Sequence, residues 1–292
     1  MKQRVITGLV LAAVLVVVVW QIYTPALVVV VAFLSAVAAN EIMRCAKIVN
    51  KFILIVGTAF AAVVPFFSNG ACLEPFVSEA VWSRVIGFVP HVVYVTALVI
   101  VFFLAMLRQY NKTKFEDVTT AVFASVVVPY GFSIIVRLRD IGGADKQIGI
   151  YFIFYALISA LVNDIGAQLT GMVCGKHKMS PNISPKKTVE GAVGGLVLSL
   201  VANVCAILLY NHFADAPLEQ PLMIALICLS PVVALLGMFG DLTASVLKRN
   251  FGVKDFGKIF PGHGGVMDRF DSSLFTLAVV HIIALAYFSA AV

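Results

Sequence analysis

The sequence predicts an all-α integral membrane protein with about nine transmembrane helices, a cytoplasmic N-terminus and a C-terminus outside the cytoplasm. Of its 292 residues, 61% are hydrophobic, and the mean hydropathy is +1.01. Only 12% are charged, whereas soluble domains average about 25%. Long apolar runs also recur along the whole chain. These observations exclude an ordinary soluble fold. In such a protein the net charge of +6 reflects membrane topology rather than nucleic-acid binding.

Nine apolar runs make up most of the chain. A helix needs ~17–25 apolar residues to cross a bilayer, and the runs at 25–40 and 52–67 are the shortest. Lys2 and Arg4 precede the first run as in a signal peptide, but its length and the second run directly after Pro25 favour a retained span. The nine runs cover residues 5–23, 25–40, 52–67, 90–107, 119–137, 148–170, 189–210, 221–246 and 272–291.

The distribution of basic residues predicts the orientation of these helices. If all nine runs span the membrane, 17 of the 21 Lys and Arg residues lie on the side of the N-terminus and 4 on the opposite side. Cytoplasmic loops are enriched in Lys and Arg. The N-terminus and the polar loop before the last run are therefore expected in the cytoplasm, and the protein in the cytoplasmic (inner) membrane.

Polar motifs are concentrated in the second half of the chain, which predicts two regions. Residues 1–140 are expected to form transmembrane helices with little motif content. Residues 141–292 are expected to form the catalytic region, with cytoplasmic loops at 171–188 and 247–271. The five cysteines fit neither a zinc motif nor a disulfide framework. No chemistry is assigned to the outer loops 68–88 and 137–147.

The densest polar segment is 245–271, S-V-L-K-R-N-F-G-V-K-D-F-G-K-I-F-P-G-H-G-G-V-M-D-R-F-D. Asp268 and Asp271 are three residues apart, so both would lie on one face of a helix that begins after Gly264-Gly265. Two adjacent carboxylates suit Mg²⁺, which takes one or two protein carboxylates and completes its shell with water and substrate phosphate. Asp241, at the end of an earlier apolar run, could supply a third carboxylate.

A simpler alternative is that these acids only stabilise a helix N-terminus through the helix dipole. The same 27 residues, however, also contain His263, two adjacent glycines and five Lys or Arg residues. This combination favours a site that handles phosphate and metal.

A second polar cluster covers residues 163–195. Asp164 ends an apolar run, and a carboxylate at that depth in a membrane is costly and commonly functional. The alternative is a polar helix end in contact with water at the membrane interface. Gly166, Gly171 and Gly175 favour close packing between helices.

Within this cluster, the segment S-P-K-K-T-V-E-G at 184–191 is suited to an anion. Pro185 predicts an extended turn, and Thr188 could cap the next helix, whose N–H groups and dipole favour negative charge. Lys186 and Lys187 beside that helix end would form a phosphate cradle, although the P-loop pattern G-x-x-x-x-G-K-[ST] is absent. An ordinary basic loop beside the membrane is the alternative.

The 245–271 segment resembles the signature of the phosphatidate cytidylyltransferase family, the CDP-diacylglycerol synthases. That signature is Ser, an apolar residue, Lys-Arg, four residues, Lys-Asp, a small residue, then His-Gly-Gly and Asp-Arg-x-Asp. Residues 184–191 also match the S-P-x-K-T-x-E-G segment of the family, so the resemblance covers about the C-terminal half of the chain. The signature positions are filled by Ser245, Lys248, Arg249, Lys254, Asp255, Gly257, Pro261, His263, Gly264, Gly265, Asp268, Arg269 and Asp271.

The resemblance implies a nine-helix fold and nucleotidyl transfer. Such an enzyme transfers CMP from CTP to phosphatidic acid, giving CDP-diacylglycerol and pyrophosphate in phospholipid biosynthesis. It uses Mg²⁺, and the resemblance leaves room for a second, monovalent ion such as K⁺. The expected partners are CTP, phosphatidic acid, membrane lipids and a second copy of the chain in a homodimer, with no nucleic acid.

The motifs and the chemistry together give each candidate residue a role. Gly264 and Gly265 would let the backbone approach a phosphate, and His263 would donate to a phosphate or orient an aspartate rather than act as a general base. The expected metal ligands are Asp241, Asp268 and Asp271, with Asp164 as a weaker candidate at the substrate site. Arg would make bidentate contacts to substrate phosphates, and Lys would act as a point charge. The residues expected at these phosphates are Lys187, Thr188, Lys248, Arg249, Lys254 and Arg269.

Three other classes of protein fit the sequence less well. A transporter or channel would place charges in mid-span within symmetric halves, whereas here they gather in two loops and at helix ends, without an internal repeat. A CDP-alcohol phosphatidyltransferase requires D-G-x-x-A-R, but Asp241 is followed by Leu242. A purely structural scaffold needs neither His263-Gly264-Gly265 nor the aspartate pair.

Overall fold

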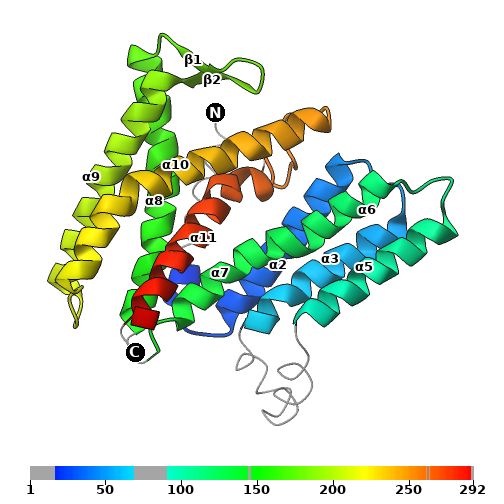
Figure 1. The fold of residues 1–292 in the computed structure, drawn as a ribbon, viewed down its shortest axis with the longest axis horizontal. Helices are drawn as coiled ribbons and strands as arrows, with labels where there is room; N and C mark the ends of the chain where they lie inside the picture. Colours follow the sequence, from blue (N-terminus) through cyan, green and yellow to red (C-terminus); the bar gives the residue numbers. More distant parts are fainter. Residues whose placement is uncertain (1–16, 69–90, 144–145, 261, 263, 291–292) are drawn as a thin grey trace. The chain divides into compact units, whose positions relative to one another are not determined.

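The computed structural model describes residues 17–68, 91–143, 146–260, 262 and 264–290, and the fold is almost entirely helical (Figure 1). These residues divide into two compact units. Unit one consists of the described residues of Met1–Arg137 and Asp255–Arg269, and unit two consists of those of Leu138–Lys254 and Phe270–Val292.

Unit one is a group of helices that lie side by side (Figure 1). Helix α2 packs against α3, and α5 packs against α6. A side chain at Gly57 would meet Ser125 and Met43, so this glycine lets α3 approach its neighbours closely. The elements are α2 (Ala26–Cys45), α3 (Lys51–Val63) with the 3₁₀ turn η1 (Val64–Ser68), α5 (His91–Arg108), α6 (Phe115–Val122), the π-helical segment η4 (Phe123–Val127) and most of α7 (Val128–Asp140).

Unit two is built around a long helical hairpin. Helices α8 and α9 pack along each other, and a small antiparallel hairpin of β1 and β2 connects them (Figure 1). The register pairs Lys178 with Thr188 and Ser180 with Ser184. The elements are α8 (Lys146–Cys174), β1 (Lys178–Ser180), β2 (Ser184–Thr188), α9 (Val189–Phe213), α10 (Gln220–Asn250) and α11 (Met267–Ala290), which enters unit two at Phe270.

Buried polar side chains link three helices of unit two. The Asn203 amide of α9 donates to the Ser159 hydroxyl of α8 and to the Ser230 hydroxyl of α10, each at 2.8 Å. The Tyr155 hydroxyl of α8 donates to the Leu226 carbonyl of α10 at 2.7 Å. In lipid, such interhelical hydrogen bonds and close contacts between small residues hold helices together. This network fixes the frame on which the polar side chains of unit two are placed.

The prediction of an all-helical membrane protein is confirmed, with the β1–β2 hairpin as an addition. Helix α3 with η1 is a shorter apolar helix, Lys51–Phe67. The number of nine spans and the orientation stay predictions, because the run at 5–23 and the loop 68–88 lie largely outside the described residues. In the described part of the chain, seven helical segments are long and apolar enough to span a bilayer: α2, α5, the continuous α6–η4–α7, α8, α9, α10 and α11.

Some boundaries differ from the sequence prediction. Helix α2 does not end near residue 40 but continues to Cys45, so it has 20 residues. Pro185 lies in strand β2 rather than in a turn. In the segment 137–147, α7 continues to Asp140 and a turn follows at 141–143.

Candidate active site

Unit two gathers the charged side chains that the sequence analysis singled out there. They come from four elements and are far apart in the sequence. Asp164 lies on α8, Lys187 on β2, Asp241 and Lys248 on α10, and Asp271 on α11. We call these five residues the carboxylate–lysine cluster.

Ion pairs organise the carboxylate–lysine cluster. The Lys187 ammonium group pairs with Oδ2 of Asp241, and both side chains are 23% exposed. The Lys248 ammonium nitrogen lies 3.8 Å from Oδ2 of Asp271, and these side chains are 12% and 10% exposed. Charges removed from water are costly unless an opposite charge accompanies them. The pairing is therefore what lets these carboxylates lie within apolar helices.

Hydrogen bonds bring the third carboxylate into the same cluster. The Ser272 hydroxyl donates to Oδ2 of Asp164 at 3.1 Å, and the Ser272 N–H donates to Oδ1 of Asp271 at 2.9 Å. The carboxylates of Asp164 and Asp241 are both close enough to repel that of Asp271. The cluster thus combines three carboxylates with two ammonium groups.

Two glycines allow α10 to approach α11 at this cluster. A Cβ at Gly240 would lie 2.7 Å from the Asp271 carbonyl oxygen and would overlap the Phe275 ring. A Cβ at Gly237, one turn earlier, would lie 2.8 Å from a methyl carbon of Thr276. The absence of side chains at these two positions therefore places Asp241 beside Asp271.

The cluster fits Mg²⁺ by the chemistry of its donors. Within the described part of the chain, no three His, Cys, Asp or Glu side chains are arranged as a ready metal shell. Mg²⁺ needs only one or two protein carboxylates, because water and substrate phosphate fill its remaining positions. Asp241 and Asp271, with Asp164 nearby, provide hard oxygen donors of this kind.

The start of α9 lies next to Lys187 in the sequence and has the predicted cap. Thr188 is buried, and its hydroxyl accepts the Gly191 N–H at 3.1 Å. The Glu190 carboxylate accepts the N–H groups of Lys176 and His177, each at 3.1 Å, and lies 2.5 Å from the His177 ring. The cap predicted at Thr188 is confirmed, and Glu190 fixes the connection from α8 to β1 beside it.

Two basic residues, one in the last turn of α10 and one after the helix, are exposed. The Arg249 guanidinium donates to the Ile183 and Val253 carbonyls, each at 3.4 Å. Lys254 is exposed as well. Both are accessible to a water-soluble ligand.

The described signature residues from Asp255 to Arg269 belong to unit one. Oδ2 of Asp268 accepts the N–H groups of Phe256 at 2.8 Å, Gly265 at 3.0 Å and Gly257 at 3.4 Å. Gly264 has φ +88°, and it exchanges backbone hydrogen bonds with Phe260. In this unit Asp268 therefore organises the loop backbone, a role that the sequence analysis did not predict.

The predicted site residues that the structure describes belong partly to unit two and partly to unit one. Asp268 lies in the first turn of α11, one turn before Asp271, as the spacing predicts. The roles of all the predicted site residues in catalysis, substrate binding and metal binding stay predictions. His263 lies outside the described residues. Unit two contains Asp164, Lys187, Thr188, Asp241, Lys248, Arg249, Lys254 and Asp271, and unit one contains Gly264, Gly265, Asp268 and Arg269.

The sequence analysis missed two side chains that contact these groups. Ser272 connects Asp164 to Asp271, and its only sequence signal is its position beside Asp271. In unit one, Glu41 accepts the N–H groups of Val266 and Met267, in the loop 255–267 that belongs to the signature. A carboxylate directly after an apolar run was the available signal for Glu41, as it was for Asp164.

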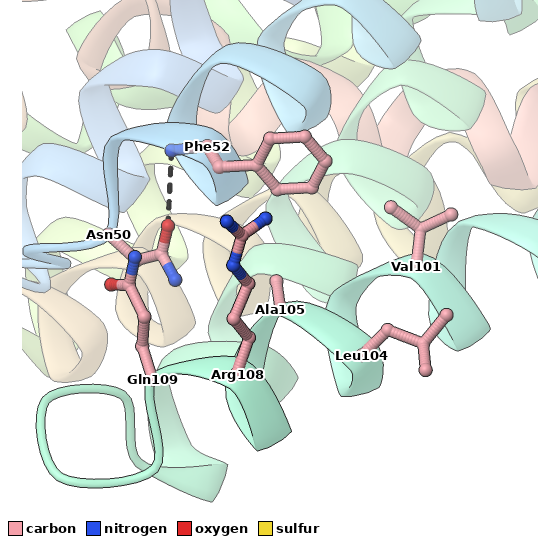
Figure 2. Close-up of a pocket in the computed structure, with 7 residues that line it drawn as sticks. All are labelled: Asn50, Phe52, Val101, Leu104, Ala105, Arg108 and Gln109. Atoms are coloured by element: carbon pink, nitrogen blue, oxygen red, sulfur yellow. Dashed lines mark hydrogen bonds between the residues drawn. The ribbon is translucent and has the colours of Figure 1, made fainter.

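A cavity of about 390 Å³ lies elsewhere in unit one, between the start of α3 and the end of α5 (Figure 2). In Figure 2 the Arg108 guanidinium points toward Asn50 and Phe52, and the Asn50 side chain accepts the Phe52 N–H at 3.1 Å. None of the predicted site residues is among those that line it, so this cavity does not locate the site. Its lining residues are Asn50, Phe52, Val101, Leu104, Ala105, Arg108 and Gln109.

Charged side chains within membrane helices are commonly functional, and a helix N-terminus favours an anion. The cluster beside the start of α9 is therefore typical of a membrane-embedded enzyme that acts on phosphate groups. Comparison with known proteins narrows this class. The model of the cytidylyltransferase family matches residues 2–287. The chain belongs to this family and is a nucleotidyltransferase.

Relatives with assigned activities support the same family. A phosphatidate cytidylyltransferase of Bacillus subtilis (strain 168) is 31% identical over 289 residues, which is 99% of each chain. A phosphatidate cytidylyltransferase of Staphylococcus haemolyticus is 37% identical over 173 residues, 59% of this chain and 61% of the relative. One from Staphylococcus aureus (strain COL) is 36% identical over the same length.

Proposed function

We propose that the chain is a phosphatidate cytidylyltransferase, which transfers CMP from CTP to phosphatidic acid in phospholipid biosynthesis. The products are CDP-diacylglycerol and pyrophosphate. The observation that carries this proposal is the carboxylate–lysine cluster of unit two, in a chain that matches a bacterial phosphatidate cytidylyltransferase over 99% of its length.

The proposed reaction is a nucleotidyl transfer. A phosphate oxygen of phosphatidic acid attacks the α-phosphorus of CTP, the bond from that phosphorus to the bridging oxygen of the β-phosphate breaks, and pyrophosphate leaves. The nucleophile is already an anion near neutral pH, so a strong general base is not needed. The barrier arises from bringing two polyanions together at a membrane surface. Catalysis should come mainly from positioning and charge neutralisation.

The candidate residues would supply both effects. Lys187 and Lys248 would act as point charges for phosphate oxygens, and Arg249 would make bidentate contacts. Asp241 and Asp271 would hold Mg²⁺, which when bound neutralises charge on the phosphate groups. The further candidates are Asp164 and Asp268 as carboxylates, His263, Thr188, Gly264 and Gly265 near phosphate, and Lys254 and Arg269 as cations. A second, monovalent ion such as K⁺ stays part of the proposal.

We further propose nine spans, with the N-terminus and the loop 247–271 in the cytoplasm and the C-terminus outside, in the cytoplasmic membrane. The excess of Lys and Arg on one side of the predicted spans supports this orientation. CTP is a cytosolic solute and phosphatidic acid lies in the leaflet, so a site at the cytoplasmic membrane surface meets both. A homodimer is the proposed assembly.

The proposal is tested with purified protein in detergent micelles that contain phosphatidic acid and Mg²⁺. CTP, ATP, GTP or UTP is added, and pyrophosphate release is measured. We expect release with CTP alone, and only when phosphatidic acid and Mg²⁺ are both present. Folded protein that releases no pyrophosphate with any nucleotide would contradict the proposal.

A further inference from the structure

Glu41 is a carboxylate of α2 that is buried against the signature loop of unit one. It is only 6% exposed. The Val266 N–H donates to its Oε1 and the Met267 N–H donates to its Oε2, each at 3.1 Å. Both carboxylate oxygens are therefore used to hold the backbone at the start of α11.

Two signature glycines lie against the same carboxylate. A Cβ at Gly257 or at Gly265 would overlap the carboxyl group of Glu41. The Cys45 thiol, one turn further along α2, lies 3.0 Å from the Phe256 carbonyl oxygen. Helix α2 thus contacts the loop near its start, at Phe256, and near its end, at Val266 and Met267. Glycine is needed at 257 and 265 because Glu41 occupies the space that a side chain would fill.

Asp268 complements Glu41 because it accepts other N–H groups of the same loop. Glu41 accepts two backbone N–H groups, and Asp268 accepts three, from Phe256, Gly257 and Gly265. A buried N–H group that loses its acceptor is costly, and hydrogen bonds to charged acceptors are stronger than neutral ones. The loop conformation therefore depends on both carboxylates.

We propose that Glu41 is a positioning residue for the reaction. It fixes the described backbone of loop 255–267 and the first turn of α11, which carries Asp268, without itself touching substrate. This inference rests on the proposed function, and it assigns a role to a residue of the N-terminal helices, which otherwise contain little motif content.

The first test is the Glu41→Gln variant, which keeps the shape of the side chain but turns one acceptor into an N–H₂ group. A misplacement of about 1 Å at a site can cost about 100-fold in rate, so kcat should fall roughly 10- to 100-fold. The KM values for CTP and phosphatidic acid should stay within about twofold, because Glu41 does not contact them. The matched control is Glu116→Gln, which changes an exposed carboxylate of α6 and should keep wild-type kcat.

A double-mutant cycle separates positioning from simple loss of folding. Gly257→Ala should lower kcat strongly because its methyl group meets Glu41. In a Glu41→Ala background the same change should cost no more than about twofold, because contacting residues are not additive. Equal effects of Gly257→Ala in both backgrounds would overturn the inference.

Hydrogen–deuterium exchange provides a readout that does not depend on activity. Amides in 255–267 should exchange faster in Glu41→Gln than in wild type or Glu116→Gln, because Val266 and Met267 lose a charged acceptor. Unchanged exchange in this segment would overturn the role of Glu41. Wild-type protein that shows this protection but no CMP transfer would instead contradict only the proposed function.

Discussion

Lys187 of strand β2 forms an ion pair with Asp241 of helix α10. The lysine precedes the N-cap of α9, and the aspartate lies next to the glycine that brings α10 against α11. One ion pair therefore connects the segment suited to phosphate with the carboxylates suited to a metal ion, within unit two.

Replacing Lys187 should impair catalysis more than folding. In Lys187→Gln, kcat should fall by about 100-fold, since removal of one preorganised donor to developing charge commonly costs that much. The control is Lys178→Gln on the neighbouring strand, whose side chain is exposed. Steady-state kinetics of both variants provide the measurement. A Lys187→Gln enzyme as active as Lys178→Gln would remove Lys187 from the site.

Asp271→Asn should give a folded protein with little activity. Loss of a metal ligand removes several kcal/mol of charge stabilisation, so we expect a decrease of about 100-fold or more. Activity should be measured over a series of Mg²⁺ concentrations after treatment with EDTA, with size-exclusion chromatography as the folding control. Normal turnover of Asp271→Asn at limiting Mg²⁺ is incompatible with its assignment as a ligand.

Asp268→Asn should behave differently from Asp271→Asn, because Asp268 also holds the loop of unit one. Hydrogen bonds to a charged acceptor contribute ~1.5–3 kcal/mol, so the variant should lose stability as well as activity. Thermal unfolding in detergent should show a lower midpoint for Asp268→Asn than for Asp271→Asn. If the two midpoints are equal, the loop does not depend on the Asp268 carboxylate.

Gly240→Ala should separate α10 from α11. The added methyl group overlaps Phe275 and the Asp271 carbonyl, and overpacking of this kind costs ~1–3 kcal/mol. Activity should fall because Asp241 and Asp271 move apart. The matched control is Ala225→Gly in α10, which makes the reverse exchange of the same two residue types at a position away from the cluster. Wild-type activity and stability of Gly240→Ala would contradict the close approach.

The sequence predicted the helices well because lipid requires long apolar segments that satisfy their own backbone hydrogen bonds. It failed at the end of α2, where Asn40, Glu41 and Arg44 interrupt the apolar run but remain helical. The β1–β2 hairpin was missed because its polar strands are only 3 and 5 residues long.

Candidate residues could be predicted where the signal was local. The spacing of Asp268 and Asp271 and the cap at Thr188 depend on neighbours within one helical turn. The contacts of Glu41 with Val266 and Met267 join residues more than 200 positions apart, so no local pattern contains them. The pairing of Lys187 with Asp241 is likewise a product of the fold, although each residue was a candidate by itself.

The most direct test of the central claim follows the phosphorus atoms of CTP. Purified protein in micelles with phosphatidic acid and Mg²⁺ is given CTP labelled in the α-phosphate or in the γ-phosphate, and the lipid fraction is extracted. The proposed reaction predicts label in the lipid from α-labelled CTP only, with the γ-label recovered in pyrophosphate. Transfer of the γ-label to lipid, or absence of label in the lipid from both nucleotides, would contradict it.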